Sequence, residues 1–485
     1  MSPQPITPTR AMDGPDRPAT EGGVVCDSFM AAFSLTPRVG RHIDGYAGPV
    51  STAGVKLPDQ LPTPSAKRLA VRITPDATRH VKVGHPWVYD DSITSLSHRG
   101  APGDLAVIFD NEREFLAIGL YDPASPIRIK VLHRGKPIPI DGDWWRSQLT
   151  NAMVKRAPVI GGNRTTGYRV VNGENDGFPG LVIDRYADTL VMKLYTTAWI
   201  PHLTTLLPAI VESLSPESVV LRLARSVRSD NLHGLTEGMA LYGEAPTTPV
   251  LFFENGLQFE ADVLAGQKTG HFLDQRDNRE LVRSKTGSAT VLDVFASTGG
   301  FSVYAAAGGA TEVTSVDLSE PTLDVAARNF AHNDDNANVR NCKHLSMVGD
   351  AFEVMDRLIR RKNTYDVVIV DPPSFAQRQT SVDRALHAYG QLTERAVKLL
   401  NPGGLLVQAS CSSRVINDEF YATVRRSAVF GGYDLHEVRR TGHAADHPVT
   451  FAEGSYLKAL FARTTMLPAE VGRPAGRTAV RRPRH

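Results

Sequence analysis

The chain of 485 residues is long enough for two or three domains with separate hydrophobic cores. Its 41% hydrophobic and 22% charged residues are ordinary for a soluble protein, and a net charge of +2 means that any nucleic-acid role must depend on local basic patches. The cysteines lack paired spacing, which argues against disulfides and a zinc site, and no apolar run reaches membrane-spanning length. We therefore expect a cytoplasmic protein without a membrane segment or a bound metal.

Both ends of the chain have compositions typical of unfolded segments. Residues 1–66 are rich in Pro, Gly and Thr and show no sustained hydrophobic periodicity. Residues 465–485 combine Pro, Gly and Arg. Such segments bury too little apolar surface to offset the entropy of ordering. We predict a disordered N-terminal extension and a basic disordered tail.

Residues 67–137 are predicted to form a small β-rich module. Short apolar runs are separated by turns containing Pro, Gly and Asp, and they lie at residues 69–73, 105–109, 116–121 and 127–132. The stretch between the first two runs contains Lys82 and Trp87, which could neutralise and stack on RNA. The alternative, that Trp87 is a core aromatic residue, stays open.

Residues 138–255 are predicted to form a central α+β domain. Two helices are expected, at residues 141–165 and 201–214. Strands are expected within residues 168–186, 190–195, 218–223 and 250–263. The order mixes the two element types without regular alternation, so this part is assigned neither to the β-rich module nor to the segment that follows.

From residue 289 onward, strands and helices are predicted to alternate. The expected strands are residues 290–295, 313–317, 345–349, 366–370 and 404–410. The expected helices are residues 300–308, 320–333, 351–361 and 384–400. Alternation of this kind predicts an α/β fold with a parallel, doubly wound, Rossmann-like sheet, which we assign to residues 256–464.

The turn after the first of these strands has the composition of a nucleotide-binding loop. The strand contains Asp293 near its end, and Gly299 and Gly300 precede a helical segment. Glycines allow a ligand to approach the backbone, and a helix N-terminus offers free N–H groups. The next strand ends at Asp317, where an acid can accept hydrogen bonds from ribose hydroxyls.

The same turn argues against two common nucleotide cofactors. It lacks the Gly-x-Gly-x-x-Gly pattern of nicotinamide enzymes, and the chain lacks the Gly-Lys-Ser/Thr of a P-loop. A cofactor with a ribose and an adenine but no pyrophosphate suits a turn with two glycines. S-adenosylmethionine is the natural candidate.

Acidic residues stand at four successive ends of the predicted strands: Asp293, Asp317, Asp350 and Asp371. Each of them taken singly has the alternative role of a helix N-cap. Ligands of a doubly wound sheet bind beyond the carboxyl ends of its strands. Together these acids, with Cys411 at the end of a further strand, predict one site at that edge.

Several motifs together resemble one family. They lie at residues 266–279, in the turn through Gly300, and at residues 315–317, 371–375, 410–412, 445–448, 456–458, 85–88, 172–174 and 184–185. On these motifs the chain resembles the class I S-adenosylmethionine-dependent methyltransferases, and within them the RlmI-like family of bacterial 23S ribosomal RNA cytosine-5 methyltransferases. The resemblance covers residues 68–463 and implies an N-terminal RNA-binding PUA domain, a central domain and a Rossmann-like catalytic domain.

The resemblance also implies which residues bind the cofactor. Asp317 would hold the ribose and Asp350 the adenine amino group, while the segment from Lys268 to Arg276 would close over the methionine moiety. The expected cofactor set is Lys268, Thr269, Asp274, Arg276, Asp293, Ala296, Ser297, Thr298, Gly299, Gly300, Asp317, Leu318, Asp350 and Asp371.

The implied reaction needs a reactive cysteine. Carbon-5 of cytosine becomes nucleophilic only after a thiolate adds at carbon-6 and converts the ring into an enamine. The family places this nucleophile at Cys411, and Asp371 would hydrogen-bond the ring as the second catalytic residue. Phe375 would stack on the extruded base. The expected substrate-binding residues are Pro372, Pro373, Phe375, Lys82 and Trp87.

Two departures from the family keep other functions open. Pro373 stands where better-known RNA cytosine methyltransferases have a second cysteine, and Ser374 stands where this branch has a lysine. The Asp-Pro-Pro-aromatic motif also resembles the one with which amino-group methyltransferases hold an exocyclic nitrogen. Methylation of a base amino group in RNA is therefore the main alternative, and a degenerate RNA-binding module is the third hypothesis.

The expected partner is 23S ribosomal RNA. The target nucleotide, the choice between free RNA and an assembled subunit as substrate, and the base that removes the ring proton stay open. The oligomeric state is also open, with a homodimer as one alternative.

Overall fold

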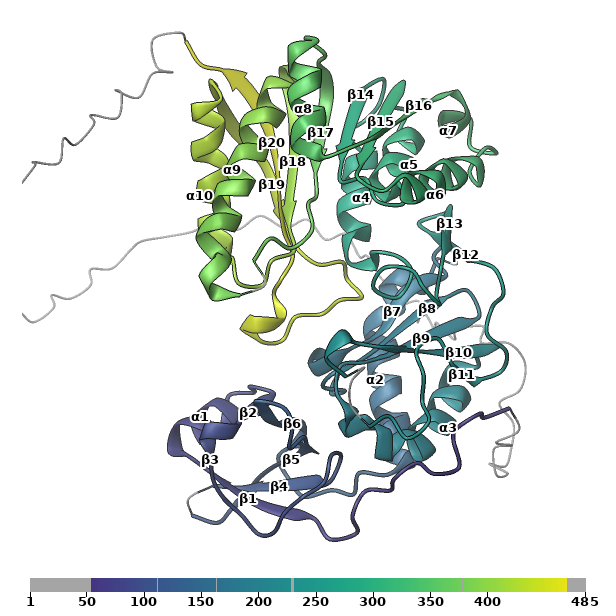
Figure 1. Cartoon of the computed structure of the whole chain (residues 1–485), viewed down its shortest axis with the longest axis vertical. Coiled ribbons are helices and arrows are strands. Elements are labelled where there is room, and N and C mark those ends of the chain that lie inside the picture. Colours follow the sequence, from purple (N-terminus) through teal and green to yellow (C-terminus); the bar gives the residue numbers. More distant parts are fainter. Residues whose placement is uncertain (1–53, 111, 163, 228–230, 377, 469–485) are drawn as a thin grey trace, which may run out of the picture. The chain divides into compact units, whose positions relative to one another are not determined.

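The computed structural model describes residues 54–110, 112–162, 164–227, 231–376 and 378–468 (Figure 1). Cys26, most of the predicted extension and most of the predicted tail lie outside these residues. Part of the extension prediction is wrong: Val55 forms an antiparallel bridge with Tyr242, and Leu57 and Leu61 pack against a hydrophobic core. The burial of these three apolar side chains stabilises a segment whose Pro-containing sequence has no regular pattern.

The first part of the described chain is built on a sheet with strand order β2-β6-β5-β4-β1-β3. Its elements are β1 (Leu69–Ile73), α1 (Pro75–Lys82), β2 (Trp87–Tyr89), β3 (Ile93–Leu96), β4 (Leu105–Phe109), β5 (Phe115–Tyr121) and β6 (Ile127–Arg134). The predicted β-rich module is confirmed, but α1 was not predicted. This helix begins where Thr74 Oγ1 accepts a hydrogen bond from the Ala77 backbone N–H and Pro75 takes the first helical position.

The central part contains a second sheet, with strand order β11-β10-β9-β8-β7. Its elements are α2 (Gly142–Ile160), β7 (Gly167–Asn172), β8 (Leu181–Tyr186), β9 (Thr189–Leu194), α3 (Leu203–Leu214), β10 (Ser218–Leu223) and β11 (Ala240–Tyr242). Trp145 of α2 and Trp199 are fully buried with ring centroids 5.4 Å apart, and they anchor the core of this part. The hairpin of β12 (Val250–Glu254) and β13 (Leu257–Ala261) follows and forms a sheet of its own.

The last part carries the predicted doubly wound sheet, with strand order β16-β15-β14-β17-β18-β20-β19. Its strands are β14 (Thr290–Val294), β15 (Glu312–Asp317), β16 (Lys343–Val348), β17 (Tyr365–Val370), β18 (Leu400–Ser410), β19 (Tyr433–Thr441) and β20 (Lys458–Met466). The strands from β14 to β18 pair in parallel, as predicted, whereas β20 pairs antiparallel with both β18 and β19. The antiparallel pair β19 and β20 was not predicted.

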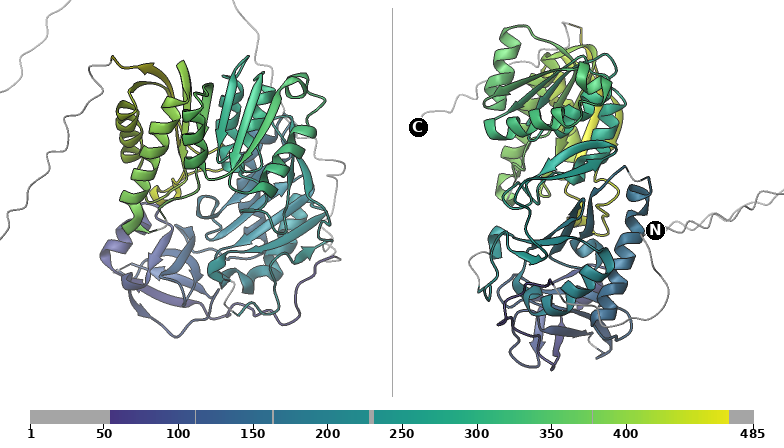
Figure 2. Two further views of the ribbon diagram at one scale, coloured as in Figure 1. Left: turned by 45° about the horizontal axis from the view of Figure 1, so that its top comes forward. Right: turned by 90° about the vertical axis from the view of Figure 1, so that its right-hand side faces the viewer.

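Helices cover both faces of this sheet (Figures 1 and 2). They are α4 (Arg276–Arg283), α5 (Gly300–Ala307), α6 (Glu320–Ala331), α7 (Ala337–Asn341), α8 (Ala351–Arg360), α9 (Val382–Lys398) and α10 (Asn417–Phe430). Successive residues of β14 supply the two cores: Val291 packs in the cluster with α4 and α5, and Leu292 packs in the cluster with α8, α9 and α10. Among the helices that the structure describes, none combines the length and apolar character that a membrane crossing requires.

Candidate cofactor and catalytic site

The turn between β14 and α5 has a constrained backbone. Phe295, Ser297 and Gly299 have positive φ angles of 65°, 49° and 75°. Side chains other than glycine rarely adopt this conformation, and such residues are concentrated at ligand-binding sites. A Cβ atom on Gly299 would lie 2.8 Å from Ala326 Cβ, so only glycine fits there. The turn therefore brings the backbone of residues 295–299 to the carboxyl edge of the sheet, as the sequence predicted.

Asp317 holds this turn from the neighbouring strand. Its Oδ2 accepts a hydrogen bond from the Ser297 backbone N–H at 2.9 Å, and its Oδ1 accepts one from the Ser319 N–H at 3.0 Å. The next residue, Leu318, is 73% exposed, which is unusual for a large apolar side chain. A carboxyl group beside an exposed leucine suits a ribose and an adenine ring, respectively. Thr298 contributes its carbonyl oxygen, which accepts a hydrogen bond from Asn329 Nδ2 at 2.9 Å.

Asp293 lies inside the same edge of the sheet. It is 1% exposed, and its Oδ2 accepts a hydrogen bond from Ser302 Oγ at 2.6 Å. Its Oδ1 is buried and has no hydrogen-bond partner among the described residues. Burial, together with the negative charges of Asp371 and Asp317, raises the pKa of Asp293 to about 7. A buried acceptor without a donor fits a cofactor that brings a cation, such as the ammonium group of S-adenosylmethionine.

Asp350 is placed differently from the other acids. Its side chain is exposed and caps α8, accepting hydrogen bonds from the backbone N–H groups of Phe352 at 2.9 Å and Glu353 at 3.2 Å. This is the alternative role that was left open for a strand-end aspartate. The adenine contact implied for Asp350 stays a prediction.

The segment that contains Lys268, Asp274 and Gln275 contacts the carboxyl edge of the sheet. Lys268 Nζ is 2.6 Å from Asp274 Oδ2, which also accepts a hydrogen bond from Tyr456 Oη at 2.8 Å. Lys268 Nζ also lies 4.6 Å from the centre of the Phe272 ring. Gln275, next in sequence to Asp274, donates from Nε2 to Asp371 Oδ2 at 3.0 Å. These contacts join the segment to the strand-end acid Asp371, and the contact of Lys268 and Asp274 with the cofactor stays a prediction.

Thr269 and Arg276 make internal contacts. The Oγ1 atom of Thr269 donates to Asp184 Oδ2 of β8 at 2.6 Å and lies 3.0 Å from Tyr186 Oη. Arg276 is 2% exposed and pairs with Asp446 at 3.0 Å. Both side chains thus anchor the segment to other parts of the protein. Their predicted contact with the cofactor is not needed to explain their positions.

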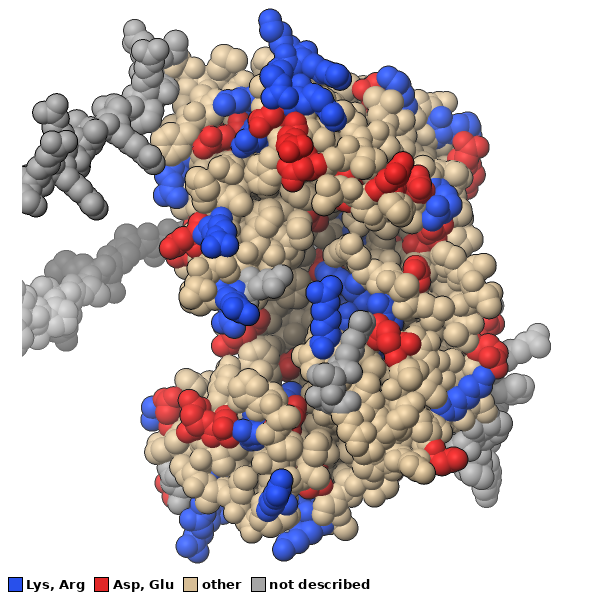
Figure 3. Space-filling model, viewed as in Figure 1, with Lys and Arg blue, Asp and Glu red and all other residues tan. Residues whose placement is uncertain are grey.

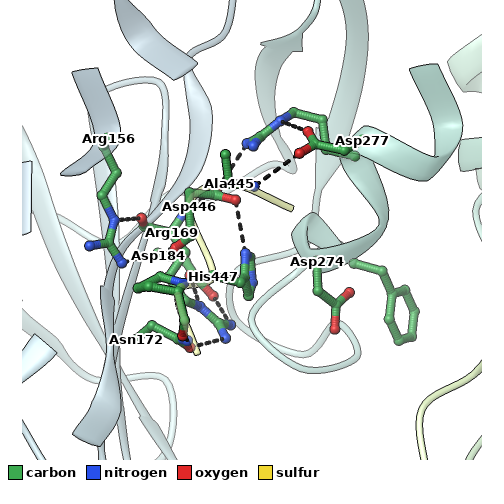
Figure 4. Close-up of polar contacts among 12 residues, drawn as sticks. Arg156, Arg169, Asn172, Asp184, Asp274, Asp277, Ala445, Asp446 and His447 are labelled. Atoms are coloured by element: carbon green, nitrogen blue, oxygen red, sulfur yellow. Dashed lines mark hydrogen bonds and ion pairs between the residues drawn. The ribbon is translucent and has the colours of Figure 1, made fainter. Parts of the chain in front are cut away.

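Asp446 is the centre of a buried polar cluster (Figure 4). Its Oδ2 accepts a hydrogen bond from the Arg169 backbone N–H at 2.8 Å and lies 3.0 Å from Arg276 Nη1. Its Oδ1 lies 2.9 Å from His447 Nδ1, and its backbone oxygen accepts a hydrogen bond from Arg156 Nη2 at 2.9 Å. The loop between β19 and β20 is thereby fixed to both the central sheet and α4.

Cys411 follows the last residue of β18, beside the Asp-Pro-Pro motif. Its Sγ lies 3.9 Å from the carbonyl oxygen of Pro372, so the structure brings these two predicted site residues together. Burial, followed by the negative charge of Asp371, raises the pKa of Cys411 to about 11. Burial and the charge of Asp274 raise the pKa of Asp371 to about 7. Pro373 is exposed next to them.

Behind Cys411 lies a chain of hydroxyl groups. The buried Tyr389 Oη accepts a hydrogen bond from Ser410 Oγ at 2.8 Å and lies 2.9 Å from Ser412 Oγ, which lies 3.1 Å from Ser374 Oγ. The Phe375 ring is half-buried and lies 5.2 Å from the Tyr389 ring. The hydroxyl chain fixes the loop after Cys411 relative to the loop that carries Ser374 and Phe375.

The predicted RNA-binding residues lie in the first part of the described chain, Lys82 at the end of α1 and Trp87 at the start of β2. Lys82 is exposed and pairs with Asp110 at 3.2 Å. The indole N–H of Trp87 donates to Glu174 Oε1 at 2.9 Å, and its ring meets Phe451 edge-on at 5.1 Å. Trp87 thus joins the first sheet to Glu174 of the central part and to Phe451 of the last part. On the face seen in Figure 3, acidic and basic side chains are interspersed.

Sequence reasoning missed several residues of this site. They are Gln275, Tyr389, Asp446, Tyr456 and Lys458 as contact residues. The motifs containing Asp446, Tyr456 and Lys458 were recognised, yet a motif does not say which atoms its side chains touch. In the described part of the chain, no cluster of His, Cys, Asp and Glu has the arrangement of a metal site.

Comparisons with known proteins agree with this arrangement. Residues 228–463 match the family described as S-adenosylmethionine-dependent methyltransferase, and residues 71–134 match the PUA-like domain. The chain is 47% identical over 406 residues to a Deinococcus radiodurans protein named ribosomal RNA large subunit methyltransferase, covering 82% of this chain and 98% of that one. It is 36% identical to ribosomal RNA large subunit methyltransferase I of Aeromonas salmonicida, covering 78% and 95%. A solved methyltransferase structure in complex with SAH has a TM-score of 0.69 at 24% identity, covers 82% of this chain and 99% of that one, and supports the fold.

Proposed function

The chain belongs to the S-adenosylmethionine-dependent methyltransferase family, and on this basis we propose that it methylates carbon-5 of a cytosine in large-subunit ribosomal RNA. The relatives named as ribosomal RNA large subunit methyltransferases support the choice of RNA, since they match this chain over nearly their full length. The observation that carries the choice of atom is the position of Cys411, beside the Asp-Pro-Pro loop and at the same edge of the sheet as the cofactor turn.

The proposed reaction uses Cys411 and Asp371 in sequence. Cys411 Sγ, as thiolate, forms a bond to carbon-6 of the cytosine, and the ring electrons move toward nitrogen-3. Asp371, whose raised pKa leaves part of the population protonated at neutral pH, donates a proton or a hydrogen bond to that nitrogen. S-adenosylmethionine supplies the methyl group. A base then removes the proton from carbon-5, the bond between Sγ and carbon-6 breaks to release the thiolate, and nitrogen-3 returns its proton to Asp371, which leaves 5-methylcytosine.

The other chain residues position the two ligands. Asp293, Asp317 and the turn 295–299 are proposed to bind the cofactor, with Lys268 and Asp274 lying over it. Pro372, Pro373 and Phe375 are proposed to hold the base, with Phe375 stacking on it after it leaves the RNA stack. The predicted domain limits, 67–137, 138–255 and 256–464, and the cytoplasmic location are kept as part of this proposal.

Trapping on a substrate analogue tests the proposal. RNA transcribed with 5-fluorocytosine has fluorine where the ring proton must leave, so a covalent complex should accumulate. We expect the adduct with the wild type and with the matched variant Cys342→Ala, and none with Cys411→Ala. Cys342 directly precedes the edge strand β16, which three strands separate from β18 in the sheet's order, and so it does not lie beside Cys411. Methylation of ordinary RNA by Cys411→Ala would overturn the thiolate mechanism.

The high pKa of Cys411 favours a second candidate function. A thiol with a pKa of about 11 is almost fully protonated at neutral pH, and the Asp-Pro-Pro motif could instead hold an exocyclic amino group through Asp371. Methylation of a base nitrogen needs no cysteine. Identifying the methylated nucleoside by mass spectrometry separates the two functions directly.

A further inference from the structure

Lys458, the first residue of β20, is a buried cation with an unusual set of partners. It is 1% exposed, and its Nζ donates to the backbone oxygens of Ser412 at 2.7 Å and Val415 at 2.5 Å. In the described part of the chain, no carboxylate lies within ion-pair distance of this ammonium group. Lys130, another buried lysine, has Asp122 at 2.8 Å. Burying a charge is costly unless it is paired, so the missing anion requires an explanation.

The position of Lys458 indicates which anion is missing. Lys458 stands opposite Ser410 in the antiparallel pairing of β18 and β20, and Cys411 follows Ser410. Both carbonyl groups that Lys458 contacts belong to the loop after Cys411. The ionised form of Cys411 raises the pKa of Lys458, although burial, the larger effect, lowers that pKa to about 8. The thiolate of Cys411 is therefore the anion whose charge acts on Lys458, while the charges of Asp371, Lys268 and Asp274 also act on Cys411.

We propose that Lys458 is a positioning residue for Cys411: it fixes the loop of residues 411–415 through two backbone oxygens and provides the counter-ion of the Cys411 thiolate. This inference rests on the proposed role of Cys411 as the nucleophile. It assigns to Lys458 the positive charge that a buried thiol needs to become reactive. The proton lost by Sγ goes to solvent, and Lys458 keeps its own proton.

Alkylation of Cys411 measures this effect without RNA or cofactor. The protein is prepared with Cys26→Ser and Cys342→Ser, so that Cys411 is the cysteine left to react. Iodoacetamide reacts with the thiolate, forming a bond from Sγ to carbon as iodide leaves, and mass spectrometry gives the rate at each pH between 6.5 and 9.5. Lys458→Gln keeps N–H donors for the two carbonyl groups but removes the charge. We expect alkylation at pH 7.5 to be about tenfold slower in this variant, equivalent to one pKa unit.

A matched control comes from the same strand. Arg463 of β20 is exposed, and its Nη1 donates to the backbone oxygen of Gly403 at 2.8 Å, far from Cys411 in the strand pairing. Arg463→Gln also removes a positive charge that contacts a carbonyl group. We expect Cys411 in this variant to be alkylated at the rate of the parent protein. An unchanged rate in Lys458→Gln, or an equal loss in both variants, overturns the proposal.

The parent protein gives a second readout that does not depend on the variant folding. While Lys458 is charged, the rate should rise tenfold per pH unit, and it should flatten above pH 8 as Lys458 loses its proton and its hold on the thiolate. A rate that continues to rise tenfold per unit through pH 9 overturns the counter-ion role. Trapping on 5-fluorocytosine RNA separates the two proposals. If Lys458→Gln is alkylated more slowly but the parent protein forms no RNA adduct, only the proposed function is overturned. If the parent protein forms the adduct but Lys458→Gln is alkylated at the parent rate, only this inference is overturned.

Discussion

Asp293 of β14 is paired with Ile369 of β17, Asp371 is the first residue after β17, and burial together with the charge of Asp371 raises the pKa of Asp293 to about 7. Asp371 also has a pKa of about 7, which burial and Asp274 raise. The buried Asp293 and the half-buried Asp371 are thus half protonated at neutral pH in the protein without ligand. A cofactor that carries positive charge favours the ionised form of Asp293, so its binding must release protons, while Asp371 keeps the proton that the proposed reaction needs.

The affinity for S-adenosylmethionine should therefore rise between pH 6 and pH 7.5. The cofactor has a sulfonium and an ammonium group, and it binds best when Asp293 is ionised, which happens as pH passes the raised pKa of that residue. We expect a gain of about tenfold over this range, the effect of one carboxyl group losing its proton. Calorimetry in buffers of different ionisation enthalpy measures both the affinity and the protons released. Asp293→Asn should lose most of the dependence, and a pH-independent affinity in the wild type would contradict the prediction.

Gly299→Ala should damage the cofactor turn. The φ angle of 75° costs an alanine about 1–2 kcal/mol, and its Cβ would lie 2.8 Å from Ala326 Cβ. We expect a lower free energy of unfolding and weaker cofactor binding, measured by denaturant titration and calorimetry. Gly287→Ala is the control, because Gly287 is exposed, has no positive φ angle, and its nearest contact for a Cβ is at 3.8 Å. Equal behaviour of the two variants would show that the turn tolerates a side chain.

Asp446→Asn should destabilise the protein by about 3–5 kcal/mol, because it removes the buried negative charge that pairs with Arg276 and leaves that arginine only the exposed Asp277. Although burial alone would raise the pKa of Asp446, the charges of His447 and Arg276 hold it well below its usual range. This carboxylate stabilises the fold above the unfolded pKa of about 4, and the contribution is lost as pH falls. Urea unfolding at pH 7 and at pH 4 should therefore show a larger difference between wild type and variant at pH 7.

Asp434→Asn serves as the control for that comparison. Asp434 is exposed on β19, where it accepts a hydrogen bond from the Leu435 backbone N–H. Its replacement should change the free energy of unfolding by less than about 0.5 kcal/mol. If Asp446→Asn were equally mild, the buried cluster would not stabilise the fold.

Trp87→Phe should lower the free energy of unfolding by about 1–3 kcal/mol. The change keeps an aromatic ring against Phe451 but removes the hydrogen bond to the Glu174 carboxylate, leaving that acceptor without its donor. Thermal unfolding measures the loss, and Lys82→Gln, whose amide can still donate to the buried Asp110 carboxylate, should cost less stability than Trp87→Phe. A reduced RNA affinity in Lys82→Gln, with a shallower dependence on salt, would support the predicted contact of Lys82 with phosphate.

The parallel strands and their acids were predictable because each leaves a local signal. Asp293 and Asp317 stand at or near the ends of short apolar runs, and the glycines of the turn are visible in sequence. Because a buried strand must be apolar on both faces, the run itself marks β14 and β15. The positions of these acids at the edge of the sheet therefore followed from the sequence, and their contact with the cofactor stays a prediction.

The contacts that complete the site leave no such signal. Tyr456 reaches Asp274 across 182 positions, and Gln275 reaches Asp371 across 96. No periodicity within a window of 10 to 20 residues can report such a pair. The edge strand β19 was missed for another reason: Leu435 is its buried residue, and the rest is exposed or half-buried, so the alternation typical of a strand is absent. Asp350 presents the opposite difficulty: its position at the end of a strand is visible in the sequence, but capping of α8 explains that position as well as cofactor binding does.

The loop between β19 and β20 also constrains the order in which the protein can be assembled during translation. Arg156 contacts Asp446 across 290 positions, and Arg169 contacts it across 277. The ribosome therefore releases both arginines long before the residue that completes their cluster, and until then they have only the nearer carboxylates of Asp176 and Asp184 as partners. At 5 to 20 residues per second, this interval lasts roughly 15 to 60 seconds. A nascent chain halted before Asp446 emerges should be sensitive to proteolysis at α2 and β7, and it should become resistant once the loop has been added.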